Sequence, residues 1–493
     1  MKKLLNLSIF VLLLFCLTFA VSAKAQREMA ESGTAAANGN AKYVFLFIGD
    51  GMGMPQINSA EAYLSSVAGE KVGVKKLSFS QFPAQGLTTT YAADQFITDS
   101  AASATALACG LKTNSGVIAM DPTGTKKFKT IAEMAKEAGL KVGIVSSVDL
   151  DHATPASFYA HNKSRNNYYD IGLELANSSF DYFGGGRLRL SKAPKDKKNQ
   201  HEVLKEKGWI MAGSREELNK IKPNSGQVYA YNYGFASDAL VYDLDRKEKD
   251  ITLAEFTKKG IELLANDNGF FMMIEGGKID WACHANDAAS AIHDTLAFDA
   301  AVQEAIKFYD KHPNDTLIIV TGDHECGGLT LGFAGTKYGS AYDLLKGQTG
   351  SQEAFNEYVL KPYKKKVAGS KGNLNDLIPA MEKHFGLSAA ELSDYEKEMI
   401  ANAFDQTMLD KKERAKDDAT FLLYGGYEPL SVTLTHILNQ KAGLAWTSYS
   451  HTGVPVPTFA KGNGAPLFHG YYDNTDIFHK MIASMKQLLG SAR

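Results

Sequence analysis

Several segments of this 493-residue chain combine residue types that can do chemistry on an anion. The most distinctive is residues 98–106 (TDSAASATA), in which the hydroxyl of Ser100 opens an alanine-rich run. Alanine favours helix, and the free N–H groups at the start of a helix attract anions. Ser100 is therefore either a cap of this helix or a nucleophile beside a bound phosphate.

Carboxylates and imidazoles occur elsewhere at spacings that suit metal ions. Asp280 and His284 are four residues apart, so one helical turn places both on one face, as a zinc site can use. Asp323 and His324 are adjacent and can both turn inward only at an irregular strand end. His451 adds a further imidazole. Each histidine alone is more often an ordinary surface or core residue, and only the set points to metal.

The elements that must position these residues follow from hydrophobic patterning. Short apolar runs predict buried parallel strands at residues 43–48, 142–145, 270–274, 317–320 and 421–423. Between the strands lie helical patterns such as residues 252–265, which open with Thr252 and Glu255 in capping-box spacing. The alternation predicts an α/β fold with a doubly wound, mostly parallel central sheet flanked by helices.

Metal-capable side chains follow the predicted strands. Asp50 comes after the first, residues 149–154 after the second, Glu275 after the third and Asp323 after the fourth. The carboxyl ends of the strands form the ligand crevice of such sheets, so these residues can meet in one site. Their oxygen-rich ligand set suits zinc and magnesium together and suffices for more than one divalent ion.

The net charge of the chain bears on whether it binds a polyanion such as nucleic acid. The 53 basic and 55 acidic side chains leave a net charge of −2, which gives no reason to expect nucleic acid. A single arginine can still bind a small phosphate: Arg165 is either a clamp for two oxygens of a tetrahedral anion or a solvent-exposed arginine at a helix end.

The N-terminal residues predict export. Lys2 and Lys3 precede an apolar run at residues 4–21, and small residues follow, as in a signal peptide cleaved after Ala23 or Ala25. The alternative is an uncleaved membrane anchor, whereas no later stretch has the length and apolarity of a membrane span. We expect a periplasmic or secreted protein. Its remaining cysteines (Cys109, Cys283 and Cys326) allow at most one disulfide, and buried free thiols are the simpler expectation.

The domain organisation follows from composition. We expect a signal peptide at residues 1–25 and a flexible lead-in at 26–41. A catalytic core would comprise 42–330 and 418–493, interrupted by an inserted helical subdomain at 331–417 whose patterns are charge-rich.

Six motifs, in order along the chain, resemble those of the alkaline phosphatase family. They are IGDGMG at 48–53, DSAASATA at 99–106, HATP at 152–155 with Arg165 downstream, EGGKID at 275–280 with His284, TGDH at 321–324, and HTG at 451–453. The resemblance runs from near Lys42 to the C-terminus, and its specificity comes from the coincidence of the six.

The resemblance implies two zinc ions and one magnesium ion per chain. The first zinc would be held by Asp280, His284 and His451, the second by Asp50, Asp323 and His324, and the magnesium by Asp50, Thr154 and Glu275. Ser100 would be the nucleophile and Arg165 the phosphate clamp. His152 and Trp281, beside these ligands, stand where family members vary, which affects metal preference, turnover and pH optimum rather than the reaction type.

The implied reaction converts small phosphate monoesters to an alcohol and inorganic phosphate through a phosphoserine. Family relatives that prefer diesters generally lack the third metal site, so the apparent magnesium ligands favour monoesters. The alternatives are a phosphodiesterase or nucleotidase on the same metal scaffold, and an exported phosphate-binding protein without turnover. The resemblance also implies a homodimer.

Overall fold

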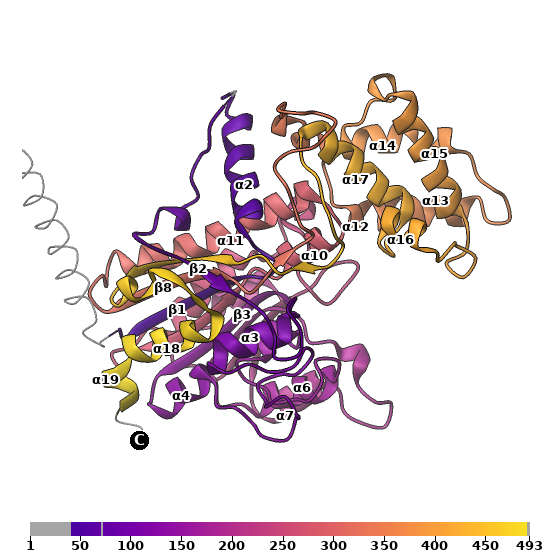
Figure 1. The fold of residues 1–493 in the computed structure, drawn as a ribbon. Coiled ribbons are helices and arrows are strands. Elements are labelled where there is room, and N and C mark those ends of the chain that lie inside the picture. Colours follow the sequence, from indigo (N-terminus) through magenta and orange to yellow (C-terminus); the bar gives the residue numbers. More distant parts are fainter. Residues whose placement is uncertain (1–40, 71, 491–493) are drawn as a thin grey trace, which may run out of the picture.

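A ten-stranded sheet forms the centre of the computed structural model, which describes residues 41–70 and 72–490 (Figure 1). The strands are β1 (Tyr43–Gly49), β2 (Ala84–Thr89), β3 (Lys141–Asp149), β4 (Tyr182–Gly186), β5 (Ile210–Ala212), β6 (Val228–Asn232), β7 (Phe270–Glu275), β8 (Thr316–Gly322), β11 (Val456–Gly462) and β12 (Gly470–Asp473). Their order is β12-β2-β11-β8-β1-β7-β3-β4-β6-β5. Only β11 among them runs against its neighbours, so the sheet is mostly parallel, as predicted.

Helices cover both faces of the sheet. On β1, Phe45 and Phe47 belong to one buried cluster and Val44 and Leu46 to another, because successive side chains point to opposite faces. The first cluster is covered by α2 (Met54–Val67), α9 (Leu253–Leu264), α10 (Lys278–His284) and α11 (Ala288–Tyr309). The second is covered by α3 (Ser100–Cys109), α4 (Ile131–Glu137), α6 (Tyr168–Asn177), α7 (Gln200–Glu206) and α18 (Asn474–Ser484). Burial on both faces explains why the central strands read as continuous apolar runs.

The predicted helix at 252–265 is confirmed as α9. Thr252 is its N-cap: the Thr252 Oγ1 accepts from the Glu255 amide at 3.1 Å. In return, the Glu255 carboxylate accepts from the Thr252 amide at 2.9 Å. The capping box read from the sequence therefore sets where this helix begins.

Four of the five predicted strands are confirmed, as β1, β3, β7 and β8. The prediction of a strand at residues 421–423 is wrong: these residues lie in α16 (Asp418–Tyr424) and their large apolar side chains are exposed. Asp417 caps this helix at its start, and Gly425 ends it in the left-handed conformation with φ of 58°. A run of three apolar residues is too short to distinguish the two structures, and the capping residues decide.

A group of helices stands apart from the sheet beyond α10 (Figure 1). We call α12 to α17, residues 352–442, the helical lobe. Its helices are α12 (Gln352–Phe355), α13 (Lys361–Lys366), α14 (Ile378–Phe385), α15 (Asp394–Met408), α16 and α17 (Pro429–Ala442). Because α17 packs against α15 and α14, the lobe continues past residue 417, and the division of the chain into core and insertion at 331–417 stays a prediction.

The short elements that complete the fold lie between these. They are α5 (Ala153–Ala156), α8 (Arg215–Lys220), α19 (Lys486–Leu489) and the two-stranded pair β9 (Glu325–Cys326) and β10 (His451–Thr452). Within residues 41–70 and 72–490, no helix has the length and apolarity to cross a membrane. The signal peptide and most of the lead-in were assigned to residues outside this described part.

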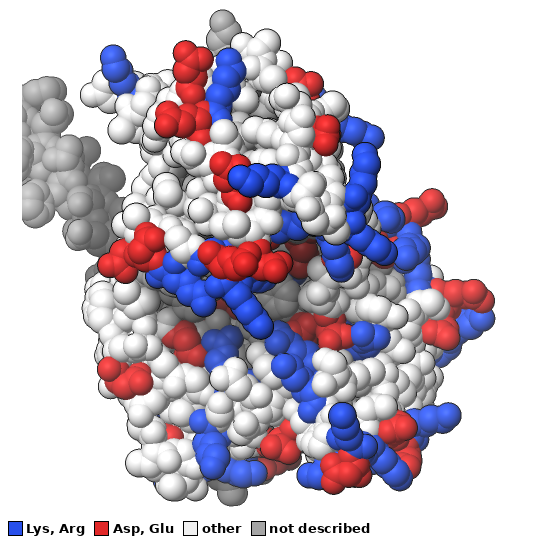
Figure 2. Space-filling model, turned by 90° about the vertical axis from the view of Figure 1, so that its right-hand side faces the viewer, with Lys and Arg blue, Asp and Glu red and all other residues white. Residues whose placement is uncertain are grey.

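Charged side chains of both signs are interspersed on the face that carries the helical lobe (Figure 2). That distribution matches the net charge of −2. A hollow lies between the helical lobe and the body of the molecule on this face, with basic and acidic groups along its edges.

Candidate active site

The candidate residues converge because their strands are neighbours. In the order β8-β1-β7-β3, the carboxyl ends carry Asp323 and His324, then Asp50, then Glu275, then the segment with His152. The registers place Ile48, just before this edge, beside both Glu275 and Thr321. The sequence-predicted meeting of residues far apart in the chain is therefore built by the parallel sheet.

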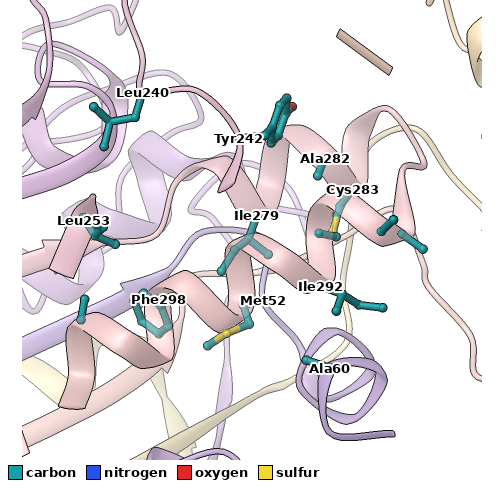
Figure 3. Packing of buried hydrophobic residues seen from close by; sticks show 14 of the residues in the cluster. Met52, Ala60, Leu240, Tyr242, Leu253, Ile279, Ala282, Cys283, Ile292 and Phe298 are labelled. Carbon is teal, nitrogen blue, oxygen red and sulfur yellow. The ribbon is translucent and has the colours of Figure 1, made fainter. Parts of the chain in front are cut away.

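The helix α10 carries Asp280 and His284 and is fixed by its buried face. Ile279, Ala282 and Cys283 point into the cluster that contains Ile292 and Phe298 of α11 (Figure 3). The remaining face of α10 then turns toward the carboxyl edge of the sheet. This packing determines which way the two ligands point.

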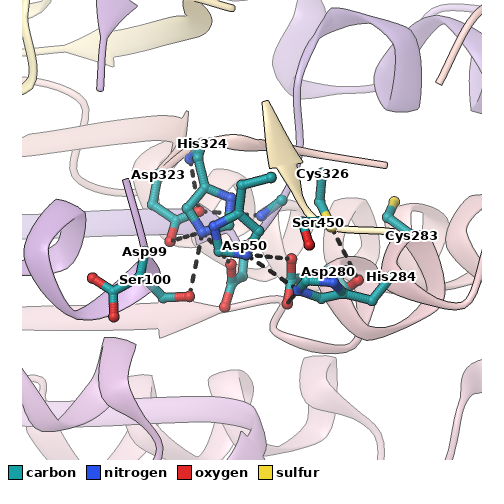
Figure 4. A network of polar contacts seen from close by, with 12 residues as sticks. Asp50, Asp99, Ser100, Asp280, Cys283, His284, Asp323, His324, Cys326 and Ser450 are labelled. Atoms are coloured by element: carbon teal, nitrogen blue, oxygen red, sulfur yellow. Dashed lines mark hydrogen bonds and ion pairs between the residues drawn. The ribbon is translucent and has the colours of Figure 1, made fainter. Parts of the chain in front are cut away.

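Asp280, His284 and His451 form a first group suited to a metal ion. Asp280 and His284 are seen beside Asp50 in Figure 4. The Nδ1 of His284 donates to the Tyr449 carbonyl at 2.6 Å, and the Nδ1 of His451 donates to the Thr98 carbonyl at 2.8 Å. Both Nε2 atoms therefore lack a proton in the neutral rings, and yet they lie only 3.2 Å apart. The carboxylate of Asp280 is 3.4 Å from one Nε2 and 3.5 Å from the other. Such a convergence of lone pairs needs a cation.

Asp50, Asp323 and His324 form the second group, and all three are fully buried. The Nε2 of His324 is 3.3 Å from Asp50 Oδ1 and 3.2 Å from Asp323 Oδ2. Burial and the nearby Asp323 carboxylate raise the pKa of Asp50 well above its usual range. Within the described residues neither oxygen of Asp50 has a hydrogen-bond partner, as expected of metal ligands.

Gly51 lets the chain turn at this point. Its φ is 70°, a conformation that favours glycine, and a Cβ there would lie 2.9 Å from the Cα of Asp280. The Gly51 amide also donates to Asp323 Oδ1 at 3.1 Å. The turn after β1 therefore brings the first and second groups together and holds one oxygen of Asp323.

A third group joins Asp50, His152 and Glu275, with Thr154 beside them. Burial raises the pKa of Glu275 to about 7. One of its oxygens accepts from Ser146 Oγ. Its other oxygen and the hydroxyl oxygen of Thr154 are buried with no hydrogen-bond partner in the described part of the chain. Hard oxygen donors of this kind are the ligands that Mg²⁺ prefers.

Ser100 is the first residue of α3 and is buried, at 2% exposure. Asp99 caps this helix by accepting from the Ala102 amide at 3.0 Å. The Oγ of Ser100 lies 3.3 Å from His324 Nε2, and thus beside the second group. The amide groups of the first helical turn favour negative charge at this hydroxyl.

Arg165 reaches the same place from a loop. One terminal nitrogen donates to Asp99 Oδ2 at 2.9 Å, and the other lies 3.1 Å from His152 Nε2. Burial and then the Arg165 charge lower the pKa of His152 well below its usual range, so this ring stays neutral and accepts from the guanidinium. Arg165 is therefore a held, oriented cation and not a solvent-exposed one.

Ser100, Arg165, His152 and the first group face one cavity of about 410 Å³. Its lining residues are Ser100, His152, Arg165, Tyr242, Asp280, Trp281, His284, Gln352, Glu353, Tyr427 and His451. The ring of Trp281 meets that of His152 edge to face, with centroids 6.0 Å apart. An anion with a tetrahedral centre can therefore reach the hydroxyl, the guanidinium and the metal-type ligands at once.

Several residues that position this site were not predicted. Asp99 orients Arg165, Ser146 holds Glu275, and Glu325 accepts from Gln56 Nε2 at 2.7 Å and from Thr452, the residue after His451. Asp99 lies in the quoted 99–106 motif and its capping position could have identified it. Ser146 and Gln56 carry no such signal, because their roles depend on strand and helix packing.

The cysteines near the site are free thiols, as expected. Cys109, Cys283 and Cys326 are buried and unpaired within the described residues. Cys326 belongs to the same cluster of potential metal ligands as Asp280, His284 and His451, and its Sγ contacts the Asp280 carbonyl at 3.7 Å. Burial raises the pKa of both Cys283 and Cys326 well above the usual range.

Comparisons with known proteins identify the family of this chain. The family model described as alkaline phosphatase matches residues 41–487. Alkaline phosphatase 4 of Bacillus subtilis is 33% identical over 487 residues, which cover 95% of each chain. The crystal structure of a cold-active alkaline phosphatase from a psychrophilic Shewanella sp. is 30% identical with a TM-score of 0.74, covering 90% of this chain and 99% of that one. A mutant of TAB5 alkaline phosphatase, described with Mg bound in the M3 site, is 26% identical with a TM-score of 0.59, covering 91% and 98%.

Proposed function

The chain belongs to the alkaline phosphatase family of phosphoric monoester hydrolases, and on that premise we propose that it works through a phosphoserine on Ser100 at a centre of two zinc ions and one magnesium ion. The observation that carries the proposal is the convergence of carboxylate and imidazole side chains beside Ser100 and Arg165, with several carboxylate oxygens that have no hydrogen-bond partner among the described residues.

The proposed zinc ligands come from the first and second groups, and the proposed magnesium ligands are the oxygen donors in and beside the third group. Asp280, His284 and His451 would hold one zinc; Asp50, Asp323 and His324 would hold the other; and Asp50, Thr154 and Glu275 would hold magnesium. Nitrogen-containing sets suit zinc, and the all-oxygen set suits magnesium. The magnesium of the TAB5 structure supports a third, magnesium-type site.

His152 and Trp281 would act beside these ligands. His152 accepts from Arg165 and packs against Trp281, so it links the phosphate clamp to the magnesium set. Neither residue would contact the attacked phosphorus in our proposal.

The chemistry would proceed by two displacements at phosphorus. Arg165 holds two oxygens of the phosphoryl group, and the amide groups at the start of α3 add positive charge. The Oγ of Ser100 attacks phosphorus, the P–O bond to the alcohol breaks, and the alcohol leaves. Water then hydrolyses the phosphoserine, which releases inorganic phosphate and restores the Ser100 hydroxyl. Two inversions give retention of configuration. When bound, the metals would supply positive charge that polarises the Ser100 hydroxyl and stabilises the departing oxygen.

Two further features stay proposals. Export rests on the N-terminal residues, which lie outside the described part. A homodimer rests on the resemblance to the family. Gel filtration with light scattering would test the second, and N-terminal sequencing of the protein recovered outside the cytoplasm would test the first.

The proposed function is tested by hydrolysis of p-nitrophenyl phosphate at mildly alkaline pH. The rate is measured before chelation, after chelation, and after zinc and magnesium are restored, with bis-p-nitrophenyl phosphate alongside. We expect fast cleavage of the monoester that disappears with the metals and returns with them. Faster cleavage of the diester would instead favour a phosphodiesterase, and retention of phosphate without turnover would favour a binding protein.

A further inference from the structure

A buried lysine joins the helical lobe to the candidate active site. Lys278 opens α10, two residues before Asp280, and is fully buried. Its Nζ lies 3.6 Å from the centre of the Tyr242 ring and 4.7 Å from the centre of a Trp281 ring. Its paired carboxylate among the described residues is Glu353, at 3.5 Å. A buried ammonium needs such a partner, so Lys278 fixes the direction of the Glu353 side chain.

The segment that carries Glu353 is itself anchored to the core. Ser351, the N-cap of α12, donates to Asp245 from its amide at 2.8 Å and from its hydroxyl at 2.5 Å. The Gln352 amide donates to Asp287 at 2.9 Å, and Asp287 caps α11 three residues after His284. The first turn of α12 is therefore held at a defined place relative to α10 and α11.

Glu353 forms part of the cavity that contains Ser100. Glu353, Tyr242, Gln352 and Tyr427 form a part of the cavity wall that contains no candidate metal ligand. Figure 3 shows Tyr242 lying over α10 beside Ala282. Ser100 and Arg165 receive the phosphoryl group, so the remaining wall faces the alcohol part of an ester. Glu353 keeps 24% of its side chain exposed, which leaves the carboxylate within reach of that part.

We propose that Glu353 selects substrates by the charge of their alcohol, favouring phosphate monoesters with an ammonium-bearing or uncharged alcohol over those with an anionic alcohol. This inference rests on the proposed function. The physical cause is the Coulomb interaction of a partly desolvated carboxylate with a charge on the alcohol. Lys278 is a positioning residue: it orients Glu353, and its own charge reduces the net negative potential of this wall.

Removing the charge of Glu353 and removing the charge of Lys278 should change the substrate preference in opposite directions. We compare kcat/KM for O-phosphoethanolamine, glycerol 3-phosphate and 2-phosphoglycolate at a pH of about 8, where an aliphatic ammonium stays protonated. In Glu353→Gln, the ratio of the ammonium ester to the carboxylate ester should fall by roughly three- to tenfold. In Lys278→Met, which keeps the side-chain length and removes its charge, the same ratio should rise.

A matched control is available on the same lobe. Glu357 lies one helical turn beyond Glu353, pairs with Lys361 at 2.9 Å and does not line the cavity. Glu357→Gln should leave the ratio unchanged. A purely structural role for Glu353 and Lys278 would lower kcat/KM for all three esters alike and leave the ratio constant, which would overturn the inference.

Glycerol 3-phosphate, whose alcohol is uncharged, distinguishes a failure of the proposed function from a failure of the proposed role of Glu353. If glycerol 3-phosphate is hydrolysed but the ratio does not move in opposite directions in the two variants, the inference fails and the proposed function stands. If the metal-loaded wild-type protein hydrolyses none of the three esters, both fail.

Discussion

Removing the metals should make the stability of this protein fall as the pH rises. Without a cation, the buried carboxyl of Glu275 favours its protonated form, because burial raises its pKa from 4.5 to about 7. The contribution of this group to stability is therefore complete below the unfolded pKa and is lost as the pH rises through the folded pKa. Burial and neighbouring carboxylates also raise the pKa values of Asp50 and Asp323.

The structure sets the size of the effect. The difference between the pKa values of Glu275 in the unfolded chain (4.5) and in the fold (about 7) corresponds to about 3 kcal/mol of unfolding free energy, lost as the pH rises from about 4 to about 8. Bound cations remove this penalty because they favour the ionised carboxylate. Restoring zinc and magnesium should thus stabilise the protein more at the higher pH than at the lower one.

The assay is denaturant unfolding of chelated and metal-restored protein at the lower and the upper end of this pH interval. Glu275→Gln is the matched variant, because an amide of the same shape cannot ionise. Its chelated form should lose less stability over this pH interval than the chelated wild type, by a difference on the order of 3 kcal/mol. Equal pH dependence in the two chelated proteins would refute the reasoning, since it would show that Glu275 does not resist ionisation in the metal-free fold.

Three other substitutions test separate parts of the structure. Ser100→Ala should reduce kcat for p-nitrophenyl phosphate by more than about 10³-fold with metal content unchanged, and substantial residual turnover would argue against Ser100 as nucleophile. Arg165→Ala should weaken competitive inhibition by inorganic phosphate by about 10- to 100-fold, the cost of a lost charge-assisted bidentate contact, and loss of metal from this variant by elemental analysis would contradict its role as a phosphate clamp. Thr252→Ala removes the cap of α9 and should lower the unfolding free energy by about 1 kcal/mol with kcat/KM unchanged; a loss of activity without loss of stability would contradict a purely structural cap.

The central strands were predictable because burial on both faces leaves a continuous apolar signal. β1, β7 and β8 carry that signal, and a candidate ligand either ends the strand, as Glu275 does, or follows it directly, as Asp50 and Asp323 do. The outer strands do not carry it: β4 is the glycine-rich YFGGG, and β11 contains Pro457 and Lys461. Their pairing depends on neighbours in the sheet, which local sequence does not specify.

The candidate site was predictable from short motifs, since each strand end carries its own ligand. The residues that position the candidate ligands were less predictable. Lys278 was quoted within a motif, but its burial against Tyr242 arises only when the segment around residue 242 packs on α10, and its pairing with Glu353 arises only when the helical lobe does. Contacts between segments dozens of residues apart leave no periodic signal in the sequence.

The most direct test of the account is to trap the proposed covalent intermediate. The metal-loaded protein would be mixed with a phosphate monoester, quenched in acid, digested and mapped by mass spectrometry. We expect one added phosphoryl group on the peptide that contains Ser100, absent from chelated protein and from Ser100→Ala. Rapid hydrolysis of the ester with no phosphoryl group on Ser100, or with one on another residue, would contradict it.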